Sequence, residues 1–225
     1  MESSCSVVLL LDGKLVSSEL YVVAYIPSNS PFSVASAMAN SLQGHFLVAA
    51  KHLRDPNFHH AVILVIEDND EGAMGLVINR PSSLTVDSAF SQVDQPVLSS
   101  APIFSGGPVE TTALFILHNC AELGGTDESV TSDIFLTGSN DSFESLVKNE
   151  QHCDHECGFR VYCGYAGWDS SQLQGEIDRG DWMVLSAEGH FVFDVDPYVV
   201  WDQCVQQVRE SNRVLPREPS DPRWN

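Results

Sequence analysis

Two aliphatic runs lie close together in this chain, Ala61-Val62-Ile63-Leu64-Val65-Ile66 and Ala73-Met74-Gly75-Leu76-Val77-Ile78-Asn79. The first is continuous and rich in β-branched residues, which is typical of a strand buried on both faces of a sheet. The acidic segment 67–72 between the runs has the composition of a turn. We therefore predict an antiparallel hairpin of two core strands, joined by a loop of about five residues.

Apolar runs on either side of this hairpin predict further strands and helices. We expect strands at residues 46–50, 103–104, 113–118, 133–137 and 160–165, and a second hairpin that pairs 182–187 with 190–193. Helices are predicted at 86–93, 141–150 and 170–179, the last of them ended by Gly180. A final helix begins after Asp196, and its buried face is expected to hold Tyr198, Trp201, Cys204, Val205 and Val208. Together these elements predict one domain over residues 41–212.

The charge of the chain limits its partners. Its 225 residues carry 11 basic and 31 acidic side chains, for a formal net charge of -20. Nucleic-acid binding draws most of its affinity from cations that neutralise phosphates, and the sequence holds no cluster of Lys and Arg. We therefore expect no direct contact with nucleic acid and no docking on an anionic membrane. The plainest consequence of the charge is solubility.

The two ends of the chain differ from its centre. Residues 1–40 hold short apolar runs and then a Ser/Pro/Asn-rich stretch of linker composition, 27–33. We predict that they are an extension, either disordered or read from a start codon upstream of the true one at Met38; the alternative is a hairpin added to the sheet edge. Residues 213–225 are predicted to be a polar, frayed tail. No apolar run is long enough to span a membrane, and no basic residue precedes the run at 7–11 as in a secretory signal, so we expect a cytoplasmic protein.

Several short motifs occur along residues 44–212 in a fixed order. They are Leu53-Arg54-Asp55-Pro56-Asn57-Phe58, Gly72-Ala73-Met74-Gly75-Leu76-Val77-Ile78-Asn79-Arg80-Pro81, Phe104-Ser105-Gly106-Gly107-Pro108-Val109, Gly164-Tyr165-Ala166-Gly167-Trp168, Gln172-Leu173, Glu176 and Gly180-Asp181-Trp182. In order and spacing the chain resembles the AlgH/YqgE family of bacterial proteins over this region.

The resemblance implies an α+β fold, with a mixed, partly barrel-like β-sheet flanked by helices. It implies no established catalytic activity and no cofactor. The label of transcriptional regulator is attached to some members of the family, and the acidity of this chain argues against direct DNA contact. One departure is visible, because Ala50-Lys51-His52 stands where the family commonly has proline; we carry over no role for that segment.

The residues that match the family are concentrated in predicted loops, where function tends to lie. We predict that four loops meet in a ligand-binding cleft formed by Asp55, Phe58, Asn79, Arg80, Ser105, Gly106, Gly107, Tyr165, Gly167, Trp168, Gln172 and Glu176. Structural alternatives stay open for each part of this set. Arg80 is expected to form an internal ion pair with Asp55, and residues 105–108 are expected to form a tight turn instead of an anion cradle. Trp168 would pack a strand–helix corner while Gln172 and Glu176 satisfy loop amides.

The cysteines and histidines are candidate metal ligands and nucleophiles. Residues 152–157 hold Cys153, His155 and Cys157, which are ligand types that zinc prefers. The spacing lacks a second ligand pair, so we expect no metal site. Nothing indicates export, so we expect the six cysteines to be free thiols. Cys163 falls in a predicted buried strand, and His118 is expected to be a surface or hydrogen-bonded histidine.

These observations favour a non-catalytic binding or regulatory protein that recognises an unknown small ligand or protein partner. One rival is a hydrolase-type enzyme with Asp55 or Glu176 as general base. Another is a protein–protein interaction module, in which the matching loops serve only the fold. Loops that converge on an open cleft would favour binding, a desolvated carboxylate in that cleft would favour an enzyme, and scattered loops would favour the interaction module.

Overall fold

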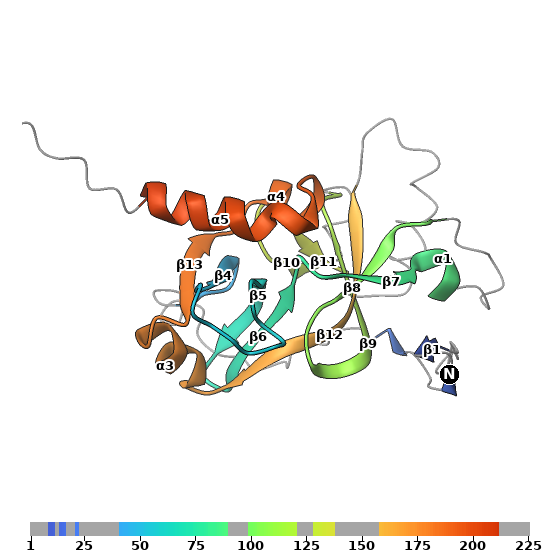
Figure 1. Ribbon diagram of the computed structural model, residues 1–225, viewed down its shortest axis with the longest axis horizontal. Helices are drawn as coiled ribbons and strands as arrows, with labels where there is room; N and C mark the ends of the chain where they lie inside the picture. Colours follow the sequence, from blue (N-terminus) through green and yellow to red (C-terminus); the bar gives the residue numbers. More distant parts are fainter. Residues whose placement is uncertain are drawn as a thin grey trace, which may run out of the picture.

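The computed structural model describes residues 9–11, 14–16, 21–22, 41–89, 99–120, 128–137 and 158–211. Their strands form one 11-stranded mixed sheet and a separate two-stranded sheet, and helices pack outside the large sheet (Figure 1). The predicted α+β class is therefore confirmed. The large sheet is open, with a different strand at each edge, and does not close into a barrel.

The predicted hairpin forms the centre of the large sheet. β4 (His45–Ala49), β5 (Val62–Asn69) and β6 (Gly72–Val77) pair with one another in antiparallel order. The hairpin loop is shorter than predicted, because Asn69 pairs directly with Gly72 and leaves only residues 70–71 between the strands. The side-chain oxygen of Asn69 accepts a hydrogen bond from the amide of Glu71 at 2.8 Å, which closes this tight turn.

The longest strand joins the two halves of the sheet. β12 (Phe159–Asp169) first pairs antiparallel with β9 (Val109–His118) and in parallel with β8 (Pro102–Ser105), and then pairs antiparallel with β6. The prediction that this strand ends near Tyr165 and releases a loop is wrong. Gly164 takes a φ of 71° and shifts the register between Cys163 and Tyr165, so the strand turns without ending. Residues 165–168 therefore lie in the sheet.

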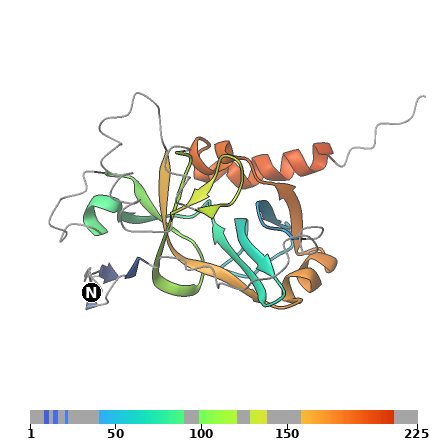
Figure 2. The same ribbon diagram turned by 180° about the vertical axis from the view of Figure 1, so that it is seen from behind.

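Two clusters of buried apolar side chains lie on opposite faces of the central strands, as the alternation of Phe46 and Val48 with Leu47 and Ala49 requires. One cluster is covered by α4 (Gly189–Phe193) and α5 (Pro197–Ser211). The other is covered by α3 (Gln172–Asp178), which contributes Leu173. Figures 1 and 2 show α5 and α3 on opposite sides of the sheet. Both faces of the predicted hairpin are thus buried, as its aliphatic composition indicated.

The prediction of a second hairpin is confirmed for its first strand and wrong for its second. β13 (Trp182–Ser186) pairs with β4, but residues 189–193 form the helix α4. Phe191 and Val192 are both buried, whereas neighbouring residues of a strand at a sheet surface would alternate. The amide of Gly189 donates to a carboxylate oxygen of Asp133 at 2.9 Å and holds the start of the helix. The contact with Asp133 is long-range, so local periodicity did not reveal it.

α5 begins with Pro197 as predicted, and four of the five residues expected on its buried face are buried. Tyr198 is the exception, with 79% of its side chain exposed. It lies in the first turn of the helix, beyond the edge of the apolar cluster. Trp201 anchors the helix to the sheet, because its indole N–H donates to the carbonyl of Ala49 at 2.8 Å.

The remaining elements are short. They are β7 (Pro81–Thr85), α1 (Val86–Ala89), β10 (Glu128–Ser129), β11 (Phe135–Leu136) and β3 (Tyr21–Val22) in or beside the large sheet, and the separate hairpin of β1 (Leu9–Leu11) and β2 (Lys14–Val16). The main path of the large sheet runs β10-β11-β9-β12-β6-β5-β4-β13. The predicted helix at 141–150 lies outside the described residues, as do residues 90–93 of the helix that starts at Val86. None of the described helices has the length and apolarity needed to cross a membrane.

Candidate functional site

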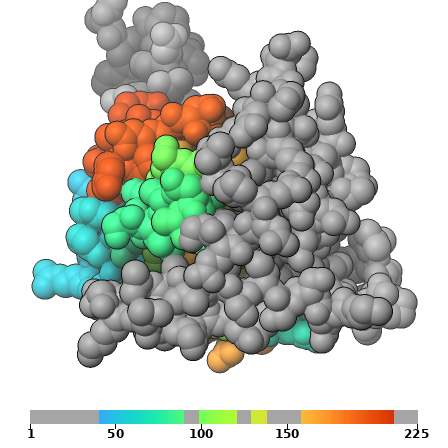
Figure 3. Space-filling view, turned by 90° about the vertical axis from the view of Figure 1, so that its right-hand side faces the viewer, coloured from blue at the N-terminus to red at the C-terminus, as the bar shows by residue number. Residues whose placement is uncertain are grey.

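Arg80 fastens the turn that contains the Leu53–Phe58 motif. Its guanidinium donates to the carbonyl of Pro56 at 3.2 Å and to that of His59 at 2.8 Å. The expected ion pair with Asp55 is wrong: a carboxylate oxygen of Asp55 accepts the amide of Asn57 at 2.8 Å and closes its own turn. Burial lowers the pKa of Arg80, and the nearby charge of Asp55 partly opposes this. The surfaces of this turn (blue to cyan), of β7 and α1 (green) and of the last helices (orange to red) adjoin on one side of the molecule (Figure 3).

Asn79 ties the same turn to the central hairpin. Its side-chain oxygen accepts the amide of Val62 at 2.9 Å, and its side-chain amide donates to the carbonyl of His60 at 2.9 Å. His60 needs this support because it takes a φ of 56°, a conformation that L residues other than glycine rarely adopt. The ring of His60 also stacks between those of His59 and Trp201. The role of Asn79 seen here is therefore structural.

The Ser105–Pro108 segment packs tightly on β12. The amide of Ser105 donates to the carbonyl of Arg80, and the amide of Gly106 donates to that of Cys163, both at 2.8 Å. A Cβ on Gly106 would lie 2.2 Å from the carbonyl oxygen of Gly164, and one on Gly107 would overlap the backbone of Tyr165. Because two amides of the supposed anion cradle are already satisfied, the segment fits the tight-turn interpretation.

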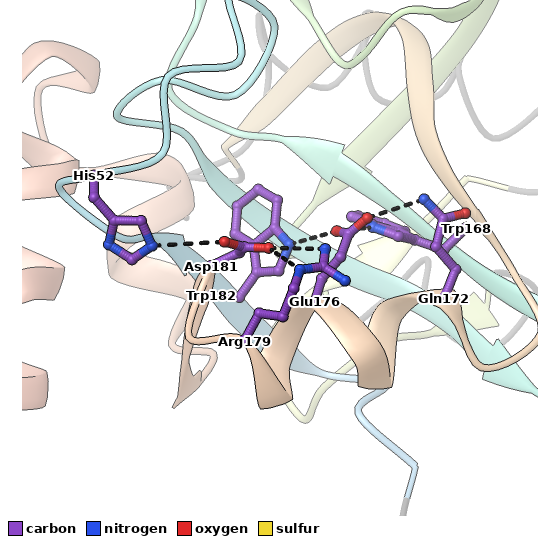
Figure 4. Close-up of polar contacts among 7 residues, drawn as sticks. All are labelled: His52, Trp168, Gln172, Glu176, Arg179, Asp181 and Trp182. Carbon is purple, nitrogen blue, oxygen red and sulfur yellow. Dashed lines mark hydrogen bonds and ion pairs between the residues drawn. The ribbon is translucent and has the colours of Figure 1, made fainter.

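Glu176, a half-buried residue of α3, is the centre of a polar network (Figure 4). One of its carboxylate oxygens accepts the indole N–H of Trp168 at 2.9 Å and that of Trp182 at 2.8 Å. The other oxygen accepts the side-chain amide of Gln172 at 2.9 Å. The ring of Phe58 stacks on Trp168 and meets Trp182 edge-on. This geometry matches the corner-packing interpretation of Trp168, Gln172 and Glu176.

A second charged contact extends this network along α3 (Figure 4). The guanidinium of Arg179 pairs with Asp181 at 2.9 Å, and the imidazole of His52 lies 3.6 Å from the other carboxylate oxygen of Asp181. The backbone carbonyl of Asp181 accepts the amide of Ala50 at 2.9 Å. The segment Ala50-Lys51-His52, which departs from the family pattern, is thus held at the end of β4 by Asp181.

The four predicted loops therefore meet, but they fill the space between themselves. Ser105 contacts Arg80, Arg80 contacts the 53–59 turn, and Phe58 from that turn stacks on Trp168. Seven of the twelve predicted residues take part in this packing and do not line the open groove described next: Asp55, Phe58, Asn79, Arg80, Ser105, Gly106 and Gly107. Glu176, although beside the groove, faces the indoles.

An open groove of about 490 Å³ lies where β12 crosses the end of the central hairpin. Four of the predicted residues line it, namely Tyr165, Gly167, Trp168 and Gln172. The other lining residues were missed: Glu67, Asn69, Glu71, Gly72, Ala73, Met74, Val109 and Asp169. The acidic composition of 67–71 was visible in the sequence but was interpreted only as a turn. Their position against β12 depends on strand pairing, which the sequence did not specify.

Two glycines form part of the floor of the groove, on β6 and β12. Strand register places Glu67, Met74 and Gly167 in one row across three strands, and Asn69, Gly72 and Asp169 in the next row. Directly paired residues project to the same face of a sheet, and so do residues two apart along a strand. Gly72 and Gly167 therefore share one face with Glu67, Met74 and Asp169, and both glycines are direct neighbours of Asp169, one across the strand pair and one along the strand.

Glycine is found at positions 72 and 167 for different structural reasons. A Cβ on Gly72, whose φ is 146°, would lie 2.3 Å from the carbonyl oxygen of Trp168. Gly167 takes a φ that any residue adopts, and a Cβ there would meet only side chains of the groove, at 3.3 Å from the Tyr165 ring and 3.9 Å from Val109. The fold requires glycine at position 72, whereas at position 167 a side chain would project into the groove, close to the Tyr165 ring.

The described cysteines are poor nucleophiles. Burial raises the pKa of Cys163 to about 11 and, with a smaller effect of Glu188, that of Cys204 to about 12, so both remain thiols near neutral pH. Both are free, as expected, but Cys120 is disulfide-bonded, so the free-thiol prediction is wrong there. His118 is buried, stacks on Phe135 and accepts the amide of Cys120.

The zinc candidates Cys153, His155 and Cys157 lie outside the described residues, so their prediction stays open. Within the described ranges there is no group of three or more His, Cys, Asp or Glu side chains that could hold a metal ion.

The fold and the site together define a class of α+β protein with an open mixed sheet. In this class the turn at residues 53–59 is held by Arg80, the carboxylate of Glu176 accepts hydrogen bonds from two indoles, and an open groove is lined by Gly72 and Gly167. The sequence profile of the AlgH-like family, DUF179, matches residues 46–212, and the chain belongs to this family.

Relatives of known sequence and structure agree with this assignment. The UPF0301 protein of Marinomonas sp. strain MWYL1 is 38% identical over 162 residues, which is 70% of this chain and 84% of that protein. The UPF0301 protein of Vibrio vulnificus strain YJ016 is 35% identical over 176 residues, which is 75% of this chain and 92% of that protein. The solution structure of the AlgH protein from Pseudomonas aeruginosa has a TM-score of 0.61 at 28% identity, and the match covers 80% of this chain and 93% of that one.

Proposed function

We propose that this AlgH-like protein is a non-catalytic, cytoplasmic binding protein, which takes a small ligand in the groove between β12 and the end of the central hairpin. A regulatory role would follow from ligand binding and not from DNA contact. The observation that carries the proposal is Gly167, an exposed glycine whose backbone does not need glycine and whose missing side chain keeps the groove floor clear. Pockets of about 300–1,000 Å³ are usual for small-molecule ligands, and this groove falls in that range.

The hydrogen bonds made by the carboxylates of Glu176 and Asp55 favour a binding protein over a hydrolase. A general base must present a lone pair to the substrate or to a water. Both oxygens of Glu176 accept hydrogen bonds from the protein's own side chains, and Asp55 closes its own turn. Each of the two carboxylates considered as a general base thus holds part of the fold in place, Glu176 with both oxygens and Asp55 with one.

A thermal-shift screen of small metabolites tests the proposal, with Gly167→Leu as a plug in the groove floor. The matched control is Gly175→Leu on α3, where a Cβ has only the mobile end of Arg179 near it, at 3.8 Å. A ligand present at about 100 times its Kd stabilises the native state by about 2.7 kcal/mol. We expect hits that raise the melting temperature of the wild type and of Gly175→Leu, and that lose this effect in Gly167→Leu.

Two results would count against the proposal. Hits that stabilise Gly167→Leu as well as the wild type would place the ligand outside the groove. A screen in which no compound stabilises the folded wild type would favour the protein–protein interaction module, which pull-down from a native lysate would then address.

A further inference from the structure

β13 lies at an open edge of the large sheet. It ends the main path of the sheet, and β4 is its only strand partner among the described residues. α5 and α3 lie on its two faces (Figure 1). We propose that the outer edge of β13 pairs in antiparallel order with β13 of a second copy of this chain, so that two sheets join into one. None of the residues of β13 lines the ligand groove, so the two surfaces are separate.

Every second residue of β13 turns its backbone groups away from β4. The amide of Ala50 donates to the carbonyl of Asp181 at 2.9 Å. The amide of Ala187 donates to the carbonyl of Gly44 at 3.0 Å. Hydrogen-bonded pairs alternate along antiparallel strands, so the odd-numbered residues of β13 bond to β4 and the even-numbered residues face outward. These outward amides and carbonyls have no hydrogen-bond partner within the described ranges, and they present a row of donors and acceptors to a further strand.

β13 lacks the features that usually protect an edge strand. Natural edges are blocked by charged side chains, proline, bulges or very short strands. Residues 182–186 are uncharged, contain no proline and pair with β4 without a register shift. Val184, at the middle of the strand, is apolar and yet keeps 38% of its side chain exposed. The strand at the other end of the sheet path, β10, has only two residues. β13 is therefore the described edge that suits strand addition.

The side chains of β13 are complementary to themselves in antiparallel order. With Val184 of each copy on a two-fold axis, Trp182 lies opposite Ser186 of the partner copy, so a large side chain meets a small one. Met183 lies opposite Leu185, which pairs two apolar side chains. In this register the outward residues of the two copies face one another, as the hydrogen bonds between the strands require.

The charges at the ends of β13 also favour the antiparallel dimer. Arg179 precedes the strand and Glu188 follows it, and their side chains are 63% and 50% exposed. Arg179 uses Nε and Nη2 for Asp181, so Nη1 points to no carboxylate of its own chain in the described structure. The antiparallel order brings Arg179 of each copy beside the strand end that carries Glu188 of the other, whereas a parallel order would bring like charges together. Asp181 lies opposite Ala187 in this register and meets no carboxylate.

Analytical ultracentrifugation of the full chain tests the pairing, because position 184 faces itself across the axis. We expect the wild type to form dimers as its concentration rises from about 10 μM to about 500 μM, by mass action. Val184→Lys and Val184→Glu should each weaken dimerisation about tenfold, because like charges would lie directly opposite each other. An equimolar mixture of the two variants should restore the dimer, since opposite charges then meet. The matched control, Val184→Thr, keeps a β-branched uncharged side chain and should dimerise as the wild type does.

Hydrogen exchange of the ¹⁵N-labelled wild type gives a second readout of the same edge. The amide of Met183 faces β4 and should be protected at every concentration. The amide of Val184 faces outward, so it should exchange quickly in dilute solution and become protected only as the dimer forms.

Three results would overturn the proposal. A wild type that stays monomeric throughout this range would leave the edge of β13 to a strand of another protein. Dimers that persist in both charged variants would place the interface elsewhere on the molecule. If both variants are monomeric and their mixture stays monomeric, position 184 does not face itself and the two-fold register is wrong.

Discussion

At the scale of single residues, the hydrogen-bond partners of Arg80 and Glu176 show that both side chains hold the fold together. Arg80 and Glu176 were both candidates for ligand contact, and both are occupied by the fold: Arg80 by two carbonyls and Glu176 by two indoles and an amide. Gly167 shows the reverse case, since its backbone does not require glycine and a Cβ there would meet the side chains of Tyr165 and Val109.

Glu176→Ala should lower the free energy of unfolding by about 2–4 kcal/mol, because it strands two largely buried indole N–H groups. Glu176→Gln should lose less than half as much, since its remaining oxygen can accept both indoles and only the bond from the side-chain amide of Gln172 is lost. Urea denaturation measures both. Equal losses in the two variants would contradict the assigned hydrogen-bond geometry.

Cys204 should make stability depend on pH in the alkaline range. Its folded pKa of about 12 lies above the ordinary value of 9.0, so the folded chain keeps this proton after the unfolded chain has lost it. The stabilisation is complete below pH 9.0 and is lost as pH rises from there towards 12, by about 1.4 kcal/mol per pH unit. In urea denaturation followed over this range, Cys204→Ala should decline less steeply than the wild type. Parallel slopes would show that Cys204 does not carry the effect.

At the scale of elements, β12 organises the molecule. It pairs with strands in both halves of the sheet and carries Tyr165, Gly167 and Trp168. Its backbone also lies in close contact with Gly106 and Gly107 of the 105–108 turn. The local sequence predicts a strand for the first half of β12, but it predicts a loop for the second half, which is also strand. Two glycines and an aromatic pair are common loop composition, and only the pairing partner β6 makes the segment a strand.

Gly106→Ala tests the contact between that turn and β12. A Cβ there would lie 2.2 Å from a backbone oxygen, and backbone cannot move aside as a side-chain tip can, so we expect a loss of about 2–3 kcal/mol. Gly175→Ala, in the open on α3, should instead gain about 0.5–1 kcal/mol through helix propensity. Calorimetry of the two variants gives the comparison; an unchanged melting temperature for Gly106→Ala would show that β8 and β12 are less closely packed than described.

At the scale of the whole molecule, the net charge of -20 sets the surroundings of the groove and the choice of partners. Self-repulsion should make the fold more stable as NaCl is raised from about 0.02 M to about 0.5 M, because charges further apart than the Debye length are then screened. In gel-shift assays at about 0.15 M salt we expect no binding to duplex DNA of any sequence. A sequence-specific shift at that salt concentration would restore direct DNA contact as a regulatory mechanism.

The sequence by itself determined the central hairpin, the α+β class, the family, the acidity and the helix that begins at Pro197, because each of these follows from local periodicity, local motifs or composition. Only the tertiary structure decided that residues 189–193 are a helix, that Arg80 binds carbonyls instead of Asp55, and that Gly72 and Gly167 share one sheet face with Glu67 and Asp169. The physical reason is common to all three. Each depends on which distant segment of the chain lies beside the residue, and the pairing of segments far apart in the sequence has no local signature.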